Sequence, residues 1–388
     1  MRAAVYTDAV LRRSPEGVHA SESFVVFVAD LRDHVDRLVL VGRGDAAPGP
    51  DHYRLRDDVE VIDLPHYPSL ADPVAVLRTA RASLRRFRRV LDGVDVVWLL
   101  GPHPFALAFA LVSLARRRRV VLGVRQDLPA HMRARYPDRR AVPAAAAALE
   151  AAWRALARLL PTVVVGTDLA GRYRHARALL PVVVSMVGDD DLVDADEAPV
   201  PSYAGPSLTL LSVGRIDPEK NPLLLVDVLE GLRKRDDRWR LVVCGDGSMR
   251  QVLDRALRDA DLDAHAQVVG FQPLHRLRRW YRESHALAHV SWTEGVPQVT
   301  FEAFAAGLPV VATDVGGVAE AVGDAAVLVP PGDAPAVVEA VARIADDPAL
   351  REGLVRRALD VARVHTGDAE RRRIAAFLSA EARRVHGG

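Results

Sequence analysis

The chain has 388 residues, of which 49% are hydrophobic, 27% are charged and 5% are aromatic. This length predicts about two to three domains, and the composition excludes a disordered or fibrous protein. The 52 basic and 51 acidic side chains leave a formal charge of +1, which argues against a protein whose main partner is a nucleic-acid backbone.

Short branched apolar runs alternate with longer patterns rich in alanine, leucine and arginine, which is typical of βαβ units with a parallel sheet. In the first half we expect strands at residues 3–6, 37–41, 59–63, 94–100, 120–124, 163–166 and 182–186. The pattern over 143–160 around Trp153 predicts a buried or half-buried helix, in preference to an interfacial membrane helix.

A domain boundary is expected where this alternation stops, because residues 194–206 are rich in acids and prolines that no central strand or helix tolerates. The predicted domains are therefore 1–197 and 207–368, joined by a linker at 198–206. Strands of the second domain are expected at 208–213, 240–244, 266–269, 286–290, 309–312 and 326–329. The helical pattern at 369–388 is free to pack back against the first domain.

Two successive α/β units predict two doubly wound sheets facing across a cleft. Ligands of such sheets bind beyond the carboxyl ends of the strands, so the cleft is the expected site.

The cellular compartment is predicted from cysteine usage and apolar segments. Cys244 is the single cysteine, so it can form neither an internal disulfide nor a cysteine-based metal site. The first apolar run meets Asp8 before it reaches the length of a signal peptide, and the longest run elsewhere, 105–115, covers about half a bilayer. We therefore expect a cytoplasmic protein with no membrane crossing.

The first group of candidate functional residues follows the strand at 208–213. Gly214 permits a close backbone approach, and Arg215 and Lys220 stand before a helix pattern at 223–233, where free amides favour an anion such as a diphosphate. The alternative is two solvated loop charges. The chain has only two lysines, Lys220 and Lys234, and the presence of one of them here favours the functional interpretation.

A second group surrounds the predicted start of another helix. Val296, Pro297 and Gln298 open this helix, with Glu294 in the loop before it and Glu302 more than a turn inside it. The two carboxylates can therefore contact one ligand at separate places. The alternative is that both glutamates are solvated and interact favourably with the helix dipole.

In this order, the two groups resemble the retaining glycosyltransferases of the glycosyltransferase 4 family. The resemblance also rests on the segments at 306–317 and 329–333, and it is dense over 208–333. It implies a GT-B fold of two Rossmann-like domains, a nucleotide-diphosphate sugar of the UDP or GDP type as donor, and neither a cofactor nor a catalytic metal.

The resemblance also implies residue roles. Arg215 and Lys220 would hold the diphosphate, Glu302 the ribose and Glu294 the sugar hydroxyls. The backbone amides of Val296 to Gln298 would complete the donor pocket, and the segment containing Phe271 and Leu274 would hold the nucleobase.

Three departures from the family pattern concern the sugar pocket and the acceptor side. Val296 replaces a large aromatic residue, Gly17 is the candidate for a glycine-rich loop near the phosphates, and Asp127 follows Gln126 where relatives have a His-Asp pair. Histidines that could meet an acceptor are His19, His103 and His131, and for His103 a structural role is favoured. The arginines at 116–119 are interpreted as the solvated end of a helix, in preference to a contact with acidic lipid.

The predicted activity is metal-independent transfer of a sugar to an acceptor hydroxyl with retention at the anomeric carbon. Glu294 is the one carboxylate that could serve as a nucleophile. The resemblance instead implies a front-face reaction in which the leaving phosphate takes the acceptor proton.

Two rival functions are a sugar-nucleotide epimerase of the same fold and a non-catalytic nucleotide-binding protein. No Gly-x-Gly-x-x-Gly opens a helix after the first strand, which argues against a dinucleotide oxidoreductase. The acceptor stays open among a small molecule, a polysaccharide and a lipid-linked sugar. We expect no nucleic-acid partner and at most peripheral membrane contact.

Overall fold

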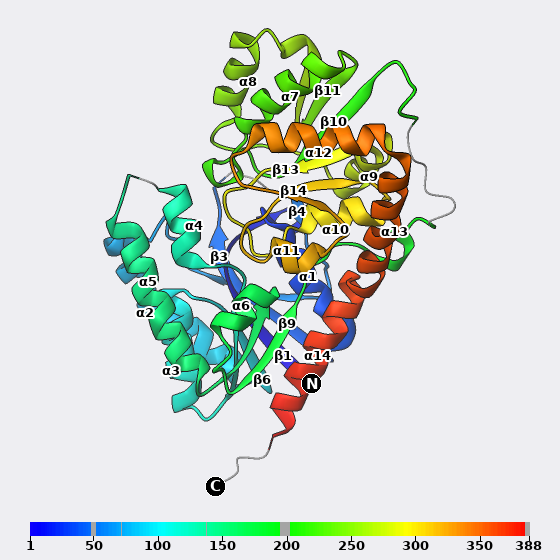
Figure 1. Ribbon diagram of the computed structural model, residues 1–388. Helices are drawn as coiled ribbons and strands as arrows, with labels where there is room; N and C mark the ends of the chain where they lie inside the picture. Colours follow the sequence, from blue (N-terminus) through cyan, green and yellow to red (C-terminus); the bar gives the residue numbers. More distant parts are fainter. Residues whose placement is uncertain (48–51, 71, 137, 195–201, 385–388) are drawn as a thin grey trace. The chain divides into compact units, whose positions relative to one another are not determined.

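The computed structural model describes residues 1–47, 52–70, 72–136, 138–194 and 202–384 (Figure 1). The chain divides into two compact units, which we call unit 1 and unit 2. Unit 1 consists of Met1–Leu128, Ala144–Val184 and Asp368–Gly388, and unit 2 of Pro129–Pro143 and Ser185–Gly367. Of the expected linker, residues 198–201 lie outside the described residues.

Unit 1 is built on a sheet whose parallel strands run in the order β5-β3-β1-β6-β7-β8-β9. The long first strand also pairs antiparallel with β2, which pairs with β4. The strands are β1 (Arg2–Ser14), β2 (Gly17–Ala20), β3 (Arg37–Asp45), β4 (Tyr53–Arg54), β5 (Glu60–Leu64), β6 (Val96–Gly101), β7 (Arg119–Val124), β8 (Pro161–Val165) and β9 (Ala178–Val182).

Helices cover this sheet because each buries an apolar stripe against the branched side chains of the strands. Phe87 of α2 stacks on Phe109 of α3 with ring centroids 4.0 Å apart, and Trp153 of α5 is fully buried. The helices packed in unit 1 are α1 (Ser23–Ala29), α2 (Pro73–Leu91), α3 (Pro104–Ala115), α5 (Ala141–Ala157), α6 (Thr167–Arg172) and α14 (Gly367–Arg383), with a 3₁₀ turn η1 (Asp30–His34).

The last helix, α14, contributes to the packing of unit 1 although it comes from the end of the chain. Ile374 and Leu378 are fully buried, and Arg373 donates a hydrogen bond of 2.8 Å to the Pro181 carbonyl. The burial of these apolar side chains and the hydrogen bond to the Pro181 carbonyl together hold this helix on unit 1.

Unit 2 contains a parallel sheet of order β12-β11-β10-β13-β14-β15. The first three strands are added toward one edge of the sheet, and the next three are added on the other side of β10. This is the order of a doubly wound fold, in which β10 and β13 are the neighbours at the switch point. The strands are β10 (Leu208–Val213), β11 (Trp239–Cys244), β12 (Ala266–Gly270), β13 (Ala286–His289), β14 (Val310–Thr313) and β15 (Val327–Val329).

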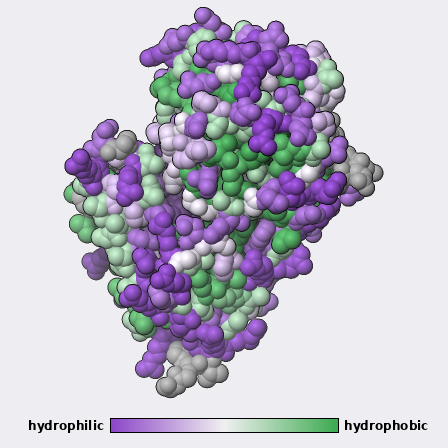
Figure 2. All heavy atoms as spheres, in the orientation of Figure 1, coloured by the Kyte–Doolittle hydropathy of each residue, from purple (hydrophilic) through white to green (hydrophobic). Residues whose placement is uncertain are grey.

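The helices of unit 2 are amphipathic in the same way. Leu253 and Leu257 of α8 face the core, while Figure 2 shows hydrophilic side chains over α8 at the top of the view. The elements are α4 (Leu128–Arg135), η2 (Asp189–Asp191), η3 (Pro218–Lys220), α7 (Leu224–Arg235), α8 (Arg250–Asp259), η4 (Asp263–His265), α9 (Leu274–Glu283), α10 (Gln298–Ala305), α11 (Val318–Val322), α12 (Ala334–Asp346) and α13 (Pro348–Val364). Among the described helices, none is long and apolar enough to cross a bilayer.

The two α/β sheets confirm the predicted fold class, and two local expectations were wrong. The strand expected at 182–186 lies earlier, at Ala178–Val182, because the buried valines after Val182 do not pair with a neighbouring strand. Gly17, the candidate for a glycine-rich loop, instead begins β2, since it pairs with Ser14 in a β-hairpin.

Candidate active site

The loop after β10 lies at the carboxyl edge of the unit 2 sheet and is packed tightly against the loop after β11. Gly214 has φ +149°, and a Cβ placed on it would meet no described atom within 4 Å. On the other side, a Cβ on Gly245 would lie 1.8 Å from the Gly214 carbonyl oxygen. The close packing at Gly245 therefore fixes one side of this loop, and the open space at Gly214 leaves the other side accessible to a ligand.

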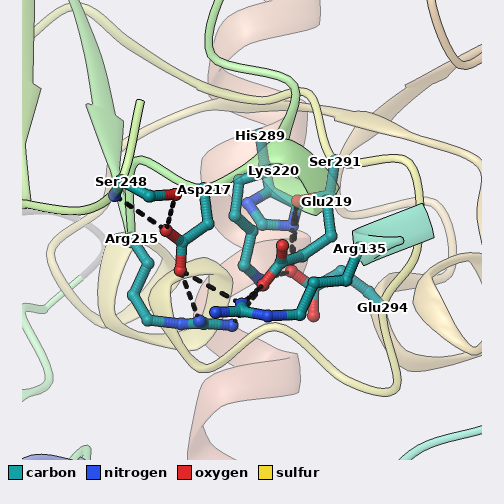
Figure 3. A network of polar contacts seen from close by, with 9 residues as sticks. All are labelled: Arg135, Arg215, Asp217, Glu219, Lys220, Ser248, His289, Ser291 and Glu294. Carbon is teal, nitrogen blue, oxygen red and sulfur yellow. Dashed lines mark hydrogen bonds and ion pairs between the residues drawn. The ribbon is translucent and has the colours of Figure 1, made fainter. Parts of the chain in front are cut away.

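Arg215 is held by two carboxylates of its own loop (Figure 3). Its Nη1 donates to Asp217 Oδ2 at 2.6 Å and its Nη2 to Glu219 Oε1 at 2.7 Å. Ser248 donates two hydrogen bonds to Asp217 Oδ1, from its backbone nitrogen at 3.0 Å and its hydroxyl at 2.8 Å. Burial by itself would raise the pKa of Asp217, but the bonds from Ser248 and the charge of Arg215 hold it below its ordinary value.

A second guanidinium reaches the same carboxylates from α4. Arg135 Nη1 lies 3.0 Å from Glu219 Oε1 and 3.4 Å from Asp217 Oδ2. The Glu219 side chain is only 1% exposed, and its Oε2 has no hydrogen-bond partner among the described residues. Two arginines thus neutralise two buried carboxylates.

Lys220 pairs directly with Glu294, which comes from the loop after the neighbouring strand β13. Lys220 Nζ donates to Glu294 Oε1, and the same oxygen lies 3.1 Å from both His289 Nε2 and Ser291 Oγ. Burial by itself would raise the pKa of Glu294, but Lys220 and His289 hold it well below its ordinary value. Glu294 is therefore an ionised hydrogen-bond acceptor and a poor proton acceptor.

Glu302 stands apart from this group, in the second turn of α10. The Tyr281 hydroxyl donates to Glu302 Oε2 at 2.7 Å. Burial raises the pKa of Glu302 although this hydrogen bond opposes the shift. Pro297 precedes the first helical residue, Gln298, so α10 begins two residues after Val296, where the sequence predicts its start.

The predicted nucleobase segment lies at the end of β12. Gly270 ends the strand with φ +75°, and Leu274 is the first residue of α9. Phe271 and Leu274 are both half-buried. Their side chains thus lie at the same carboxyl edge as the loops that carry Arg215 and Glu294, two strands away from β10.

The acceptor-side candidates do not form one cluster. Gly17 begins β2, and His19, which is 8% exposed, lies 3.1 Å from the Ser14 hydroxyl within the hairpin. Asp127 pairs with Arg172 at 2.5 Å. His131 belongs to unit 2, where it interacts with Glu219 and where burial lowers its pKa.

His103 is the centre of a polar network in unit 1 and caps α3. Its Nδ1 accepts from the Phe105 backbone nitrogen at 3.2 Å, so the ring proton lies on Nε2, which is 3.1 Å from Asp8 Oδ1. The Tyr67 hydroxyl lies 3.1 Å from Nε2 and also donates to Asp8. Burial lowers the pKa of His103, although the Asp8 charge opposes this shift.

Sequence reasoning did not single out several of these residues. A local signal existed for Asp217 and Glu219, which follow Arg215 by two and four residues, and for Ser248, which follows the Gly-Asp-Gly segment after β11. Local signals were absent for Arg135, Asp8 and Tyr67, whose partners are distant in sequence. His289 ends β13 and Ser291 follows it by two residues, and only their contacts with Glu294 draw attention to them.

Comparison with known proteins gives a family match in the second half of the chain. Residues 198–360 match the family model described as "Glycosyl transferases group 1". The D-inositol 3-phosphate glycosyltransferase of Kribbella flavida is 34% identical over 165 residues, which are 40% of this chain and 39% of the relative. The amylovoran biosynthesis glycosyltransferase AmsK of Erwinia amylovora is 29% identical over 145 residues, which are 35% and 36% of the two chains. The chain thus matches less than half the length of these relatives.

Similarity in fold extends over the whole chain. Sucrose-phosphate synthase from Thermosynechococcus elongatus aligns with a TM-score of 0.77 and 17% identity, covering 98% of each chain. HepE from Anabaena in complex with UDP and glucose aligns with a TM-score of 0.67 and 16% identity, covering 98% of this chain and 100% of that one. These neighbours confirm the predicted GT-B fold. The second half of this chain is therefore similar in sequence to the group 1 glycosyltransferases, and its whole length shares the GT-B fold.

Proposed function

We propose that this protein transfers a sugar from a nucleotide-diphosphate sugar to an acceptor hydroxyl with retention of the anomeric configuration. The observation that carries the proposal is the pairing of Arg215 and Lys220 with buried carboxylates at the carboxyl edge of β10. Both cations are held by ion pairs beside a loop whose glycine leaves open space. Preorganised cations of this kind stabilise the negative charge that develops on a leaving diphosphate.

In this proposal each of the remaining donor residues binds a different part of the nucleotide sugar. Glu302 accepts hydrogen bonds from the ribose, Glu294 accepts them from the transferred sugar, and Phe271 and Leu274 contact the base. Gly214 and the amides of Val296 to Gln298 complete the pocket around the phosphates. UDP is the first donor nucleotide to test, because UDP is bound in the similar HepE structure, with GDP as the alternative.

Retention is assigned to a front-face reaction. The bond between the anomeric carbon and the phosphate oxygen breaks, the acceptor oxygen bonds to the same face, and the leaving phosphate takes the acceptor proton. The ion pair of Glu294 with Lys220 argues against Glu294 as nucleophile or base, because it stabilises the carboxylate and keeps its pKa low.

For the acceptor we propose a hydroxyl compound that meets residues of unit 1, with Asp8, whose side chain is 34% exposed, and the buried His103 and Tyr67 that position it as candidate contacts. Gly17, His19, Asp127 and His131 remain in the proposal with less support, because Gly17 and His19 belong to the hairpin of β1 and β2, Asp127 pairs with Arg172, and His131 lies in unit 2. A cytoplasmic location remains part of the proposal, on the ground of the single cysteine.

Thermal shifts with UDP, GDP, ADP and dTDP sugars would test donor binding, since a ligand of the native state raises the unfolding temperature. Calorimetry with the stabilising nucleotide would then compare two variants. We expect Glu302→Ala to weaken nucleotide binding, because the ribose is present in the nucleotide itself. Glu294→Ala should leave this binding nearly intact and lower turnover.

Two outcomes would contradict the proposal. An equal loss of nucleotide affinity in both variants would contradict the division of roles between the glutamates. An epimerised nucleotide sugar formed without any acceptor would contradict transfer and favour the epimerase.

A further inference from the structure

One side of α2 in unit 1 carries an unusual concentration of arginine. The helix has six arginines and no acidic residue. At 100° per residue, five of them fall within an arc of about 100° on the exposed side of the helix. This arginine face consists of Arg78, Arg81, Arg85, Arg88 and Arg89.

The arginine face has no charge partner in the part of the chain that the structure describes. None of its five guanidiniums makes an ion pair or hydrogen bond with a described residue, whereas Arg12, Arg43 and many other arginines pair with carboxylates. The chain has 51 acidic residues, so acids are not scarce. The positive charge of α2 is therefore directed at solvent or at a partner.

Exposed apolar side chains lie at the start of α2 and just before it. Leu70, Val74 and Leu77 are 45%, 54% and 74% exposed. Val74 and Leu77 share the side of the helix that carries Arg78 and Arg81. Exposed apolar side chains beside a cationic face suit a bilayer surface, where apolar groups enter the headgroup region and cations meet anionic lipids.

The neighbouring helix α3 also exposes an apolar side chain. It packs against α2 (Figure 1), and its Leu111 is 61% exposed. At the other end of α2, Asp92 pairs with Arg116 at 2.9 Å and Arg118 at 3.7 Å, so the arginine cluster after α3 lies next to α2. Residues 73–118 contain nine arginines against two aspartates, Asp92 and Asp95.

The placement of α2 relates this surface to the expected acceptor residues. The helix follows the carboxyl end of β5, so its apolar start lies at the carboxyl edge of the unit 1 sheet. Leu70 is three residues from Tyr67, which bonds to His103.

We propose that the arginine face docks unit 1 on an anionic bilayer, with Leu70, Val74 and Leu77 entering the headgroup region. Anionic headgroups supply the negative charge that the protein lacks here, and each arginine near such a surface contributes about 1 kcal/mol. A nucleic acid would satisfy the arginines and leave the exposed leucines without a partner. The surface therefore fits a bilayer better than a nucleic acid.

Vesicle flotation with the full chain tests the proposal and needs no nucleotide sugar, so its result is independent of the proposed function. We expect binding to phosphatidylcholine vesicles that contain phosphatidylglycerol, and little binding to phosphatidylcholine alone. The triple variant Arg78→Gln/Arg81→Gln/Arg85→Gln should bind about 100-fold more weakly, at about 1 kcal/mol for each arginine.

A matched control removes the same charge from unit 2. Arg255, Arg258 and Arg282 are exposed and have no ion pair among the described residues. The variant Arg255→Gln/Arg258→Gln/Arg282→Gln should bind vesicles as the wild type does. Equal weakening of both triple variants would overturn the proposal, because net charge alone would then explain the binding.

The apolar part is tested by Val74→Ser/Leu77→Ser, which leaves the charge unchanged. We expect this variant to bind vesicles more weakly than the wild type does. The difference should remain at high salt, because salt screens the arginines and does not affect apolar insertion. Circular dichroism of each variant verifies the fold. Wild-type protein that fails to float with anionic vesicles, or that binds a short RNA while ignoring vesicles, would overturn the proposal.

Discussion

The two lysines of the chain have opposite surroundings. The Lys220 side chain is 23% exposed and bonds to the buried Glu294, whereas Lys234 is 71% exposed and pairs with Glu230 on the surface of α7. We predict that Lys220→Ala lowers kcat/KM by about 30- to 1,000-fold, the effect of removing one preorganised donor worth about 2 to 4 kcal/mol. Lys234→Ala is the matched control and should retain wild-type kinetics. Wild-type turnover by Lys220→Ala would contradict the diphosphate assignment.

Arg135 controls the charge balance around Arg215 without belonging to the same loop. Removing it would leave Arg215 facing two carboxylates, Asp217 and Glu219, with a net negative charge beside the proposed diphosphate. We predict that Arg135→Ala weakens nucleotide-diphosphate binding about tenfold, as measured by calorimetry. Arg133 lies exposed on the same helix with no ion pair among the described residues, so Arg133→Ala should bind normally.

A second substitution distinguishes this electrostatic effect from a loss of structure. Adding Glu219→Gln to Arg135→Ala removes the uncompensated carboxylate and should restore most of the affinity. If the double variant binds no better than Arg135→Ala, the charge-balance explanation is incorrect.

At the scale of elements, the cap of α3 depends on pH. Burial lowers the pKa of His103 from its ordinary value of 6.5, so the folded state prefers the neutral ring whose Nδ1 accepts from Phe105. Stability from this group is therefore complete above about pH 6.5 and declines as the pH falls below it, by up to about 1.4 kcal/mol for each pH unit.

We predict that His103→Asn, which keeps a capping acceptor and removes the titration, flattens this decline. Denaturant unfolding of both proteins between about pH 7.5 and about pH 5.5 measures the difference. Parallel pH profiles for the two proteins would contradict the assignment.

The helix α14 stabilises unit 1 through a few buried side chains. Leu378 and Ile374 are fully buried, whereas Val364 at the end of α13 is 67% exposed. We predict that Leu378→Ala lowers the free energy of unfolding by about 2 to 5 kcal/mol, as large-to-small core substitutions do. Val364→Ala should change it by less than about 0.5 kcal/mol. Denaturant unfolding, monitored by hydrogen exchange in the strands of unit 1, would compare the free energies of unfolding of the two variants.

At the scale of the whole molecule, ligand binding should affect the two units differently. The proposed donor residues lie in unit 2, so a bound nucleotide diphosphate stabilises that unit by mass action. We predict increased hydrogen-exchange protection at residues 214–221 and 291–298 when UDP or the preferred nucleotide is added. Protection confined to unit 1 would contradict the placement of the donor.

The sequence by itself determined the fold class and the loops that carry the proposed donor residues. Apolar runs separated by helical patterns predicted the strands of unit 2 to within about two residues, because parallel strands buried on both faces form nearly continuous runs of branched apolar residues. The carboxyl ends of such strands meet at one edge, so Arg215, Lys220 and Glu294 could be placed together without knowledge of side-chain contacts.

Tertiary structure alone decided which charges pair and where distant segments pack. Lys220 and Glu294 are 74 residues apart, and Arg135 and Glu219 are 84 residues apart, so no local pattern connects them. The hairpin of β1 and β2, the network of Asp8, Tyr67 and His103, and the packing of α14 on unit 1 were decided in the same way. Local sequence specifies the period and burial of an element, whereas long-range pairs depend on how the whole chain brings those elements together.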